Sequence, residues 1–235
     1  MKHRAAPLGL FVALVLGLML AGCSSPSMPD RERQAVGDGL LPRTSPENVL
    51  FNLRLLYGEK DDLVNTVEEA HYWAERYREL FHPDFKFYFL PGEEPPWFPE
   101  CWWGIDDEVA AFESLLVAVA MGDVEDIRLS WTVNPAVDDN RVDQYGQPLH
   151  PGWKWIHVTS VLLEIMETDE QGWRVSNGYA DFYFDEDPAD TTLWVVTEWW
   201  DREPWSSVHP SGVAYGLTST EAVTWGRLKG LFMYR

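Results

Sequence analysis

The sequence predicts an α+β domain in which three helices come first and long antiparallel strands follow. Three segments of the first half carry apolar residues at helical spacing, and they lie within residues 46–57, 66–81 and 106–121. The period then changes to two over residues 127–133, as in a strand with one buried face. The apolar segments that follow are separated by short turns, which favours an antiparallel meander.

The ends of the three expected helices have sequence signals. The first begins with Ser45 as N-cap and Pro46 as its first residue, and it ends at Gly58. The second begins after residue 65 or 66 and ends at about Phe81, where a His-Pro pair stops it. The third begins with Asp106 as a cap.

Strands are expected over residues 85–90, 127–133, 153–167, 173–184 and 193–200. The Pro- and Trp-rich segment 91–104 is expected to form a loop or a lid, and 134–152 a polar loop. Residues 224–232 are expected to pack back onto the domain as a short helix or turn.

The N-terminus has the pattern of an export signal. A basic start at residues 2–4 precedes an apolar run over residues 8–20, which is shorter than the roughly 20 residues that span a bilayer as a helix. Residues 20–23 read Leu-Ala-Gly-Cys, which resembles the lipobox of bacterial lipoproteins. The resemblance implies that residues 1–22 are a signal peptide, cut before Cys23, and that the thiol of Cys23 carries lipid.

The lipid anchor sets the expected boundaries and localisation. Residues 23–44 are rich in Ser, Pro, Gly and charge, so we expect a lipidated cysteine followed by a disordered tether, with the folded domain over residues 45–235. The expected location is the bacterial cell envelope, with the membrane as a partner through the lipid. By resemblance to lipoprotein sorting, Ser24 after the cysteine favours the outer membrane if the host has two membranes.

Composition narrows the possible functions. The chain has 18 basic and 38 acidic residues and a formal net charge of −20, so nucleic acid is not expected as a partner. With Cys23 lipidated, Cys101 has no disulfide partner, and its aromatic neighbours favour a buried, inert thiol. The histidines are dispersed and no metal-ligand spacing or phosphate-binding loop occurs, so neither a metal nor a cofactor is expected.

Three segments together resemble the nuclear transport factor 2-like superfamily, which includes SnoaL-like domains. They are YRELFHPDFKFYFL at residues 77–90, DDEVAAFESLL at 106–116 and GYADFYFDED at 178–187. The resemblance covers about residues 45–202. It implies a cone in which a strongly curved antiparallel sheet wraps around the three N-terminal helices, with a pocket at the open end. Members of this superfamily include isomerases, cyclases and dehydratases as well as binding proteins, so the fold does not give the activity.

Polar residues that interrupt apolar strands are the candidates for chemistry. His157 lies in one expected strand, and Tyr179, Asp181 and Tyr183 share one face of the next. A Tyr–Asp–His cluster on neighbouring strands could hold and protonate a carbonyl or hydroxyl group. The alternative, which the sequence favours, is a solvent-facing row or a satisfied structural network.

Three hypotheses for the function remain. The first is a membrane-anchored envelope lipoprotein that binds a small apolar ligand or a protein partner without catalysis, and Trp131 and Trp199 are candidates for its binding surface. The second is a SnoaL-like acid–base isomerase, dehydratase or cyclase, which requires His157, Asp181 and a tyrosine to meet inside a cavity. The third is a dimeric assembly module of the envelope.

Overall fold

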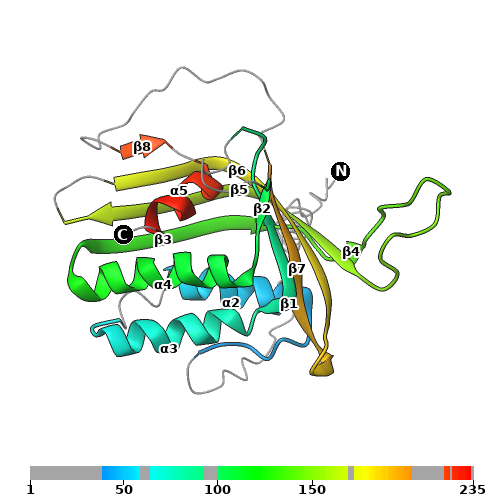
Figure 1. Cartoon of the computed structure of the whole chain (residues 1–235), viewed down its shortest axis with the longest axis horizontal. Helices are drawn as coiled ribbons and strands as arrows, with labels where there is room; N and C mark the ends of the chain where they lie inside the picture. Colours follow the sequence, from blue (N-terminus) through cyan, green and yellow to red (C-terminus); the bar gives the residue numbers. More distant parts are fainter. Residues whose placement is uncertain are drawn as a thin grey trace, which may run out of the picture. The chain divides into compact units, whose positions relative to one another are not determined.

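A computed structural model of the chain describes residues 39–58, 64–92, 100–168, 172–202, 220–222 and 224–233 (Figure 1). The expected signal peptide, Cys23 and most of the expected tether lie outside these residues, as does part of the segment 91–104. The α+β fold class is confirmed: a curled sheet wraps around helices. None of the described helices is long and apolar enough to cross a membrane.

The described strands form one sheet, with the order β2-β1-β7-β6-β5-β3. Two short strands pair off this path, β4 with β5 and β8 with β6. The strands are β1 (Phe81–Tyr88), β2 (Trp102–Trp103), β3 (Val124–Val133), β4 (Val137–Asp138), β5 (Lys154–Glu167), β6 (Gly172–Asp187), β7 (Asp190–Arg202) and β8 (Thr220–Ala222). The sheet is mixed and not purely antiparallel as expected, because β1 pairs parallel with β7 and β8 parallel with β6.

The long strands β5, β6 and β7 pair antiparallel, which confirms the predicted meander. Their register places Ile156 opposite Phe182 and Phe182 opposite Trp199. These three side chains are fully buried, so they define the face of the sheet that packs on the helices. Because side chains alternate along a strand, His157 and Asp181 lie on the other face.

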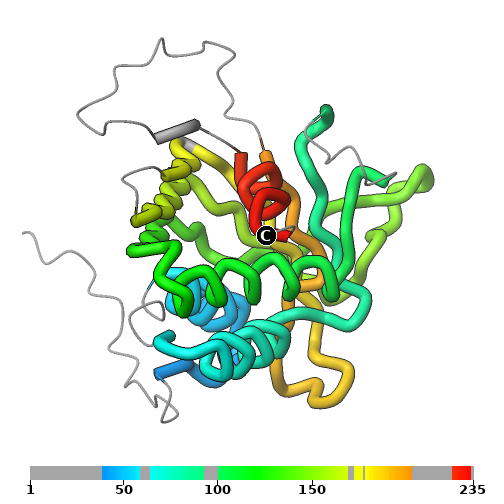
Figure 2. The backbone as a smooth tube through the Cα atoms, turned by 60° about the vertical axis from the view of Figure 1, so that its left-hand side comes forward, coloured from blue at the N-terminus to red at the C-terminus, as the bar shows by residue number. Residues whose placement is uncertain are grey.

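Four described helices pack with this sheet: α2 (Pro46–Gly58), α3 (Val67–Arg78), α4 (Ile105–Met121) and α5 (Trp225–Phe232). Thr66 and Glu69 form a capping box at the start of α3, and Gly122 ends α4 in the left-handed conformation. The last helix, α5, lies next to α4 and against β6 (Figure 2). It is therefore a fourth helical element of the core. The sequence predicted either a short helix or a turn here, and the structure has a helix.

Four local predictions were wrong. The third helix is capped by Gly104 and not by Asp106, because α4 already begins at Ile105. The second helix ends at Arg78 and β1 starts already at Phe81, because Phe81 pairs with Val196 of β7 before the Pro-containing irregularity in the register. Two residues of the expected loop 91–104 form β2, which pairs with the end of β1. Cys101 is exposed and not buried, since it precedes the strand pairing that buries Trp103.

Candidate functional site

A fully buried ion pair joins Glu108 of α4 to Lys229 of α5, on the side of the sheet that packs on the helices. The Nζ atom of Lys229 lies 2.7 Å from each carboxylate oxygen of Glu108. Glu108 is 0% exposed and Lys229 5% exposed. Removing two charges from water is costly, so such a pair persists only where its geometry and its other hydrogen bonds compensate.

Two further donors complete the surroundings of the Glu108 carboxylate. The hydroxyl of Tyr77 donates to Oε1 at 2.6 Å, and the indole Nε1 of Trp103 donates to Oε2 at 3.0 Å. Both donors are buried. Each carboxylate oxygen therefore accepts one hydrogen bond from a neutral group in addition to its contact with Lys229.

Aromatic rings surround the ammonium group of Lys229. Its Nζ lies 3.5 Å from the ring centre of Trp199 and 4.0 Å from that of Phe87. A ring face attracts a cation, and the attraction is strongest where water is excluded. Burial nevertheless lowers the pKa of Lys229 to about 8, while the negative charge of Glu108 opposes this shift.

The helical periodicity of α4 and α5 explains why these charges are buried. In α4, Glu108 lies one turn before Phe112 and two turns before Leu115 on the buried face. In α5, Lys229 lies one turn after the buried Trp225 and therefore on the same face. A charge on the apolar face of a helix is the sequence signal that could have predicted the burial of Glu108 and Lys229.

Glycine allows α5 to approach the sheet closely. A Cβ atom at Gly226 would lie only 2.6 Å from Cδ1 of Phe89. The backbone N–H of Gly226 donates to Oδ2 of Asp201 at 3.2 Å, which fixes the start of the helix on β7. This contact and the ion pair tie α5 to the domain at two points.

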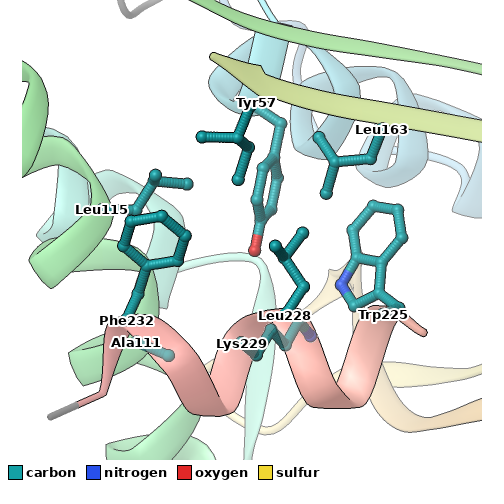
Figure 3. Close-up of a pocket in the computed structure, with 9 residues that line it drawn as sticks. Tyr57, Ala111, Leu115, Leu163, Trp225, Leu228, Lys229 and Phe232 are labelled. Atoms are coloured by element: carbon teal, nitrogen blue, oxygen red, sulfur yellow. The ribbon is translucent and has the colours of Figure 1, made fainter. Parts of the chain in front are cut away.

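A small pocket lies beside the ion pair, between α2, α4, α5 and β5 (Figure 3). Its lining residues are Tyr57, Ala111, Leu115, Leu163, Ile165, Trp225, Leu228, Lys229 and Phe232. The void among them is about 10 Å³, enough for one water molecule, and the pocket is partly open to solvent.

Tyr57 connects this pocket to the ion pair. Its ring packs edge-on against that of Tyr77, with ring centres 5.8 Å apart, and Tyr77 in turn donates to Glu108. Burial raises the pKa of both tyrosines well above their ordinary value of 10.0, and the nearby Glu108 charge raises them further. Both phenols therefore stay protonated at neutral pH.

The predicted Tyr–Asp–His cluster forms, but on the outer face of the sheet. Nδ1 of His157 lies 2.7 Å from Oδ1 of Asp181, and the His157 ring stacks on Tyr179 with ring centres 5.8 Å apart. Trp155 Nε1 also donates to Oδ1 of Asp181 at 3.0 Å, and Arg202 Nε donates to Oδ2 at 2.7 Å. The Asp181 carboxylate is thus bound by three side chains, on the face opposite to the pocket.

Tyr183 lies further along the same outer face. The guanidinium of Arg141 stacks over its ring at 3.6 Å and pairs with Oε2 of Glu198 at 2.6 Å. The two tryptophans that are candidates for ligand binding lie on the inner side. Trp199 is fully buried beneath Lys229, and Trp131 is half-buried beside Phe182.

No metal site is evident: no cluster of three or more His, Cys, Asp or Glu side chains with metal-ligand geometry occurs among the residues that the structure describes. The polar side chains at the pocket are those of Lys229 and Tyr57, and Glu108 and Tyr77 lie next to them. The Lys229 ammonium is directed at a carboxylate and at ring faces, which leaves it poorly placed to attack or deprotonate a bound molecule.

Comparison with known proteins gives only loose matches. No protein-family model and no curated protein matches the chain. An uncharacterized protein with a cystatin-like fold from Caulobacter vibrioides superposes with a TM-score of 0.37 at 16% identity, over 66% of this chain and 87% of that chain. A candidate scytalone dehydratase from Novosphingobium aromaticivorans superposes with a TM-score of 0.36 at 15% identity, over 69% and 85%. Likeness at this level carries no conclusion about family or activity.

Mutation of the ion pair tests its energetic role. We expect Lys229→Met and Glu108→Gln each to lower the free energy of unfolding by about 3–5 kcal/mol, since each leaves a buried group without its partner. The double variant should cost less than the sum of the two, with a coupling energy of about 2–3 kcal/mol in urea unfolding. Additive effects would contradict a direct interaction.

The lowered pKa of Lys229 predicts how stability depends on pH. Its pKa is about 8 in the folded protein and 10.5 ordinarily, so between these values the unfolded chain binds more protons than the folded one. The free energy of unfolding should therefore rise from pH 8 to about 9.5, below the ordinary titration of tyrosine near 10. Urea unfolding of Lys229→Met should lack this rise, and an equal rise in the variant would contradict the assignment.

Proposed function

We propose that the chain is a lipid-anchored protein of the bacterial envelope whose folded domain binds a small, largely apolar molecule without catalysis. The observation that carries the binding part is the apolar pocket beneath α5, which is partly open to solvent. Most of its lining is aliphatic or aromatic, as is usual for sites that bind small molecules, and its void of about 10 Å³ admits one small group of a ligand. One polar group of a ligand fits the void, and the rest of the molecule would extend toward the open side.

Two features favour binding over the alternative of acid–base catalysis. The charged group at the pocket, Lys229, is engaged by Glu108 and by aromatic rings. The predicted acid–base cluster around Asp181 lies on the opposite face of the sheet, where Arg202, Trp155 and His157 occupy the carboxylate. An isomerase, dehydratase or cyclase needs a proton-transferring group within reach of its substrate. Neither Lys229 nor the Asp181 cluster meets this requirement at the pocket.

The lipid anchor is proposed from the N-terminal sequence alone. The basic start, the short apolar run and the Leu-Ala-Gly-Cys segment at residues 20–23 support it. Lipid on Cys23 would hold an acidic domain at a membrane that would otherwise repel it. In a host with two membranes the proposed location is the outer membrane.

Lipidation can be tested with a matched pair of cysteine variants. In a bacterial host fed a labelled palmitate analogue, the wild-type chain and Cys101→Ser should both become labelled, because only Cys23 lies in the lipobox-like segment. Cys23→Ser should lose the label. Label retained by Cys23→Ser would rule out this anchor.

Ligand binding can be tested by native mass spectrometry of the full chain extracted in detergent. The expected result is an added mass of a few hundred daltons, about the size of a drug-like ligand. Leu115→Trp, which would fill the pocket with a larger side chain, should lose this mass, whereas Leu149→Trp on the surface should retain it. A bare protein mass under gentle conditions would contradict the proposal.

An exposed apolar arm favours a second candidate function, self-association. The arm consists of residues 134–153. Its β4 pairs with the start of β5, and Val142 pairs with Pro148 near the tip. Three apolar side chains of the arm are exposed: Val142 by 55%, Tyr145 by 78% and Leu149 by 48%. Exposed apolar groups that lie together on a structured element are typical of interfaces. The native mass spectra should then show a dimer. Tyr145→Ser should weaken this dimer, whereas Tyr72→Ser, at an exposed tyrosine on α3, should leave it unchanged.

A further inference from the structure

The arm, residues 134–153, leaves the domain beside the segment through which the N-terminal part of the chain enters it. The backbone N–H of Ala136, at the base of the arm, donates to Oε1 of Glu47 in the first turn of α2 at 3.2 Å. Close by, the carbonyl oxygen of Arg43 accepts from the backbone N–H of Trp194 in β7 at 2.7 Å. Beyond β4, the arm projects from the sheet and away from the helices (Figure 1).

The strand register places the base of the arm and residues 40–47 at the same end of the meander. Lys154, which follows the arm, pairs with Phe184, and Phe184 pairs with Val196, two positions after Trp194. With lipid on Cys23, as proposed above, the chain reaches the membrane from this end of the domain. A short connection raises the effective concentration of whatever this end presents to the bilayer.

The tip of the arm, residues 142–149, presents apolar side chains and little charge. Val142, Tyr145 and Leu149 are 55%, 78% and 48% exposed. Tyrosine has an apolar ring and a polar hydroxyl, which suits the boundary between headgroups and acyl chains. The tip has a single charged residue, Asp143, in a chain of net charge −20. It can therefore approach a bilayer where most of this acidic surface gains nothing from doing so.

The tip also satisfies most of its own backbone N–H groups. Oδ1 of Asp143 accepts from the backbone N–H groups of Tyr145 at 2.8 Å and Gln147 at 2.9 Å. The N–H groups of Asp143, Gly146 and Leu149 donate to carbonyl oxygens within the arm at 2.8, 3.0 and 2.9 Å. Backbone groups that already have partners lose little when water is removed, so this turn can enter the membrane interface at low cost.

Arg141 fixes the arm behind its tip. Its guanidinium pairs with Oε2 of Glu198 in β7 at 2.6 Å and with Oδ2 of Asp139 at 2.8 Å. It also stacks over the ring of Tyr183 in β6 at 3.6 Å. These contacts tie the arm to two strands of the sheet. An arm that is already ordered loses little conformational freedom when its tip binds a surface.

We infer that the tip of the arm inserts into the interface of a zwitterionic lipid bilayer, with Tyr145 at the level of the headgroups and Val142 and Leu149 toward the acyl chains. This inference rests on the proposed lipid anchor and adds a second membrane contact, which orients the domain on the surface. The position of the arm beside the N-terminal entry favours the bilayer over a second copy of the chain as the partner of the tip.

Quenchers carried by lipid acyl chains test the inference. The full chain with Cys101→Ser, purified with its lipid, is labelled with a fluorescent dye at Gln144→Cys in the tip or at Glu75→Cys on α3, both of which are exposed positions. Each labelled chain is reconstituted on phosphatidylcholine vesicles that contain nitroxide-labelled acyl chains. The dye at position 144 should lose emission, whereas the dye at position 75 should not.

Serine variants separate insertion of the tip from insertion of the dye. With the label at position 144, the combined changes Val142→Ser, Tyr145→Ser and Leu149→Ser should abolish the loss of emission, because they remove the apolar side chains that enter the bilayer. Tyr72→Ser, at an exposed tyrosine on α3, should retain it. All four side chains are exposed, so the variants should keep the thermal unfolding midpoint of the parent chain.

Flotation of the vesicles distinguishes failure of this inference from failure of the lipid anchor. A chain that floats with the vesicles but shows no quenching at position 144, or equal quenching at both positions, would overturn the inference and leave the anchor intact. Self-quenching between dyes at position 144, without quenching by lipid, would assign the tip to a second copy of the chain. A chain that does not float would reject the anchor and the inference together.

Discussion

The buried contact between Glu108 and Lys229 is the interaction on which the rest of the interior depends. It joins α4 to α5 across 121 residues of sequence, and it supplies the charge that orients Tyr77 and Trp103. Because a lone buried charge is strongly unfavourable, α5 cannot leave the domain without exposing or stranding Glu108. The contact therefore fixes α5 over the inner face of the sheet, and α5 in turn forms one wall of the pocket.

The two faces of the meander serve different purposes. Phe182 and Trp199 face the helices and are fully buried, whereas Asp181, which precedes Phe182 in β6 and pairs with Trp200, faces the other way. On that outer face, Asp181 accepts hydrogen bonds from side chains of two neighbouring strands, which ties β5, β6 and β7 together. The outer cluster is accordingly explained by its structural role.

The sequence predicted the parts of the fold that depend on local signals. Apolar spacing located α2 and α4, the Ser-Pro pair marked the start of α2, and short turns predicted the antiparallel β5–β6–β7 meander. The parallel pairing of β1 with β7 could not be predicted from the sequence, because no local pattern encodes a partner more than 100 positions away in the chain. The site was missed for the same reason: Glu108 sits among acidic neighbours in DDEVAAFESLL, and its partner lies in the last helix. The only sequence signal for the burial of Glu108 and Lys229 is their position on the apolar faces of their helices.

Hydrogen exchange of the α5 amides, read by mass spectrometry of the full chain, tests most directly whether α5 is part of the core. If the Lys229–Glu108 contact and the packing of Trp225 hold α5 in place, these amides should exchange as slowly as those of β5, only through global unfolding. Exchange of the α5 amides at the rate of exposed surface amides, while β5 stays protected, would contradict the account.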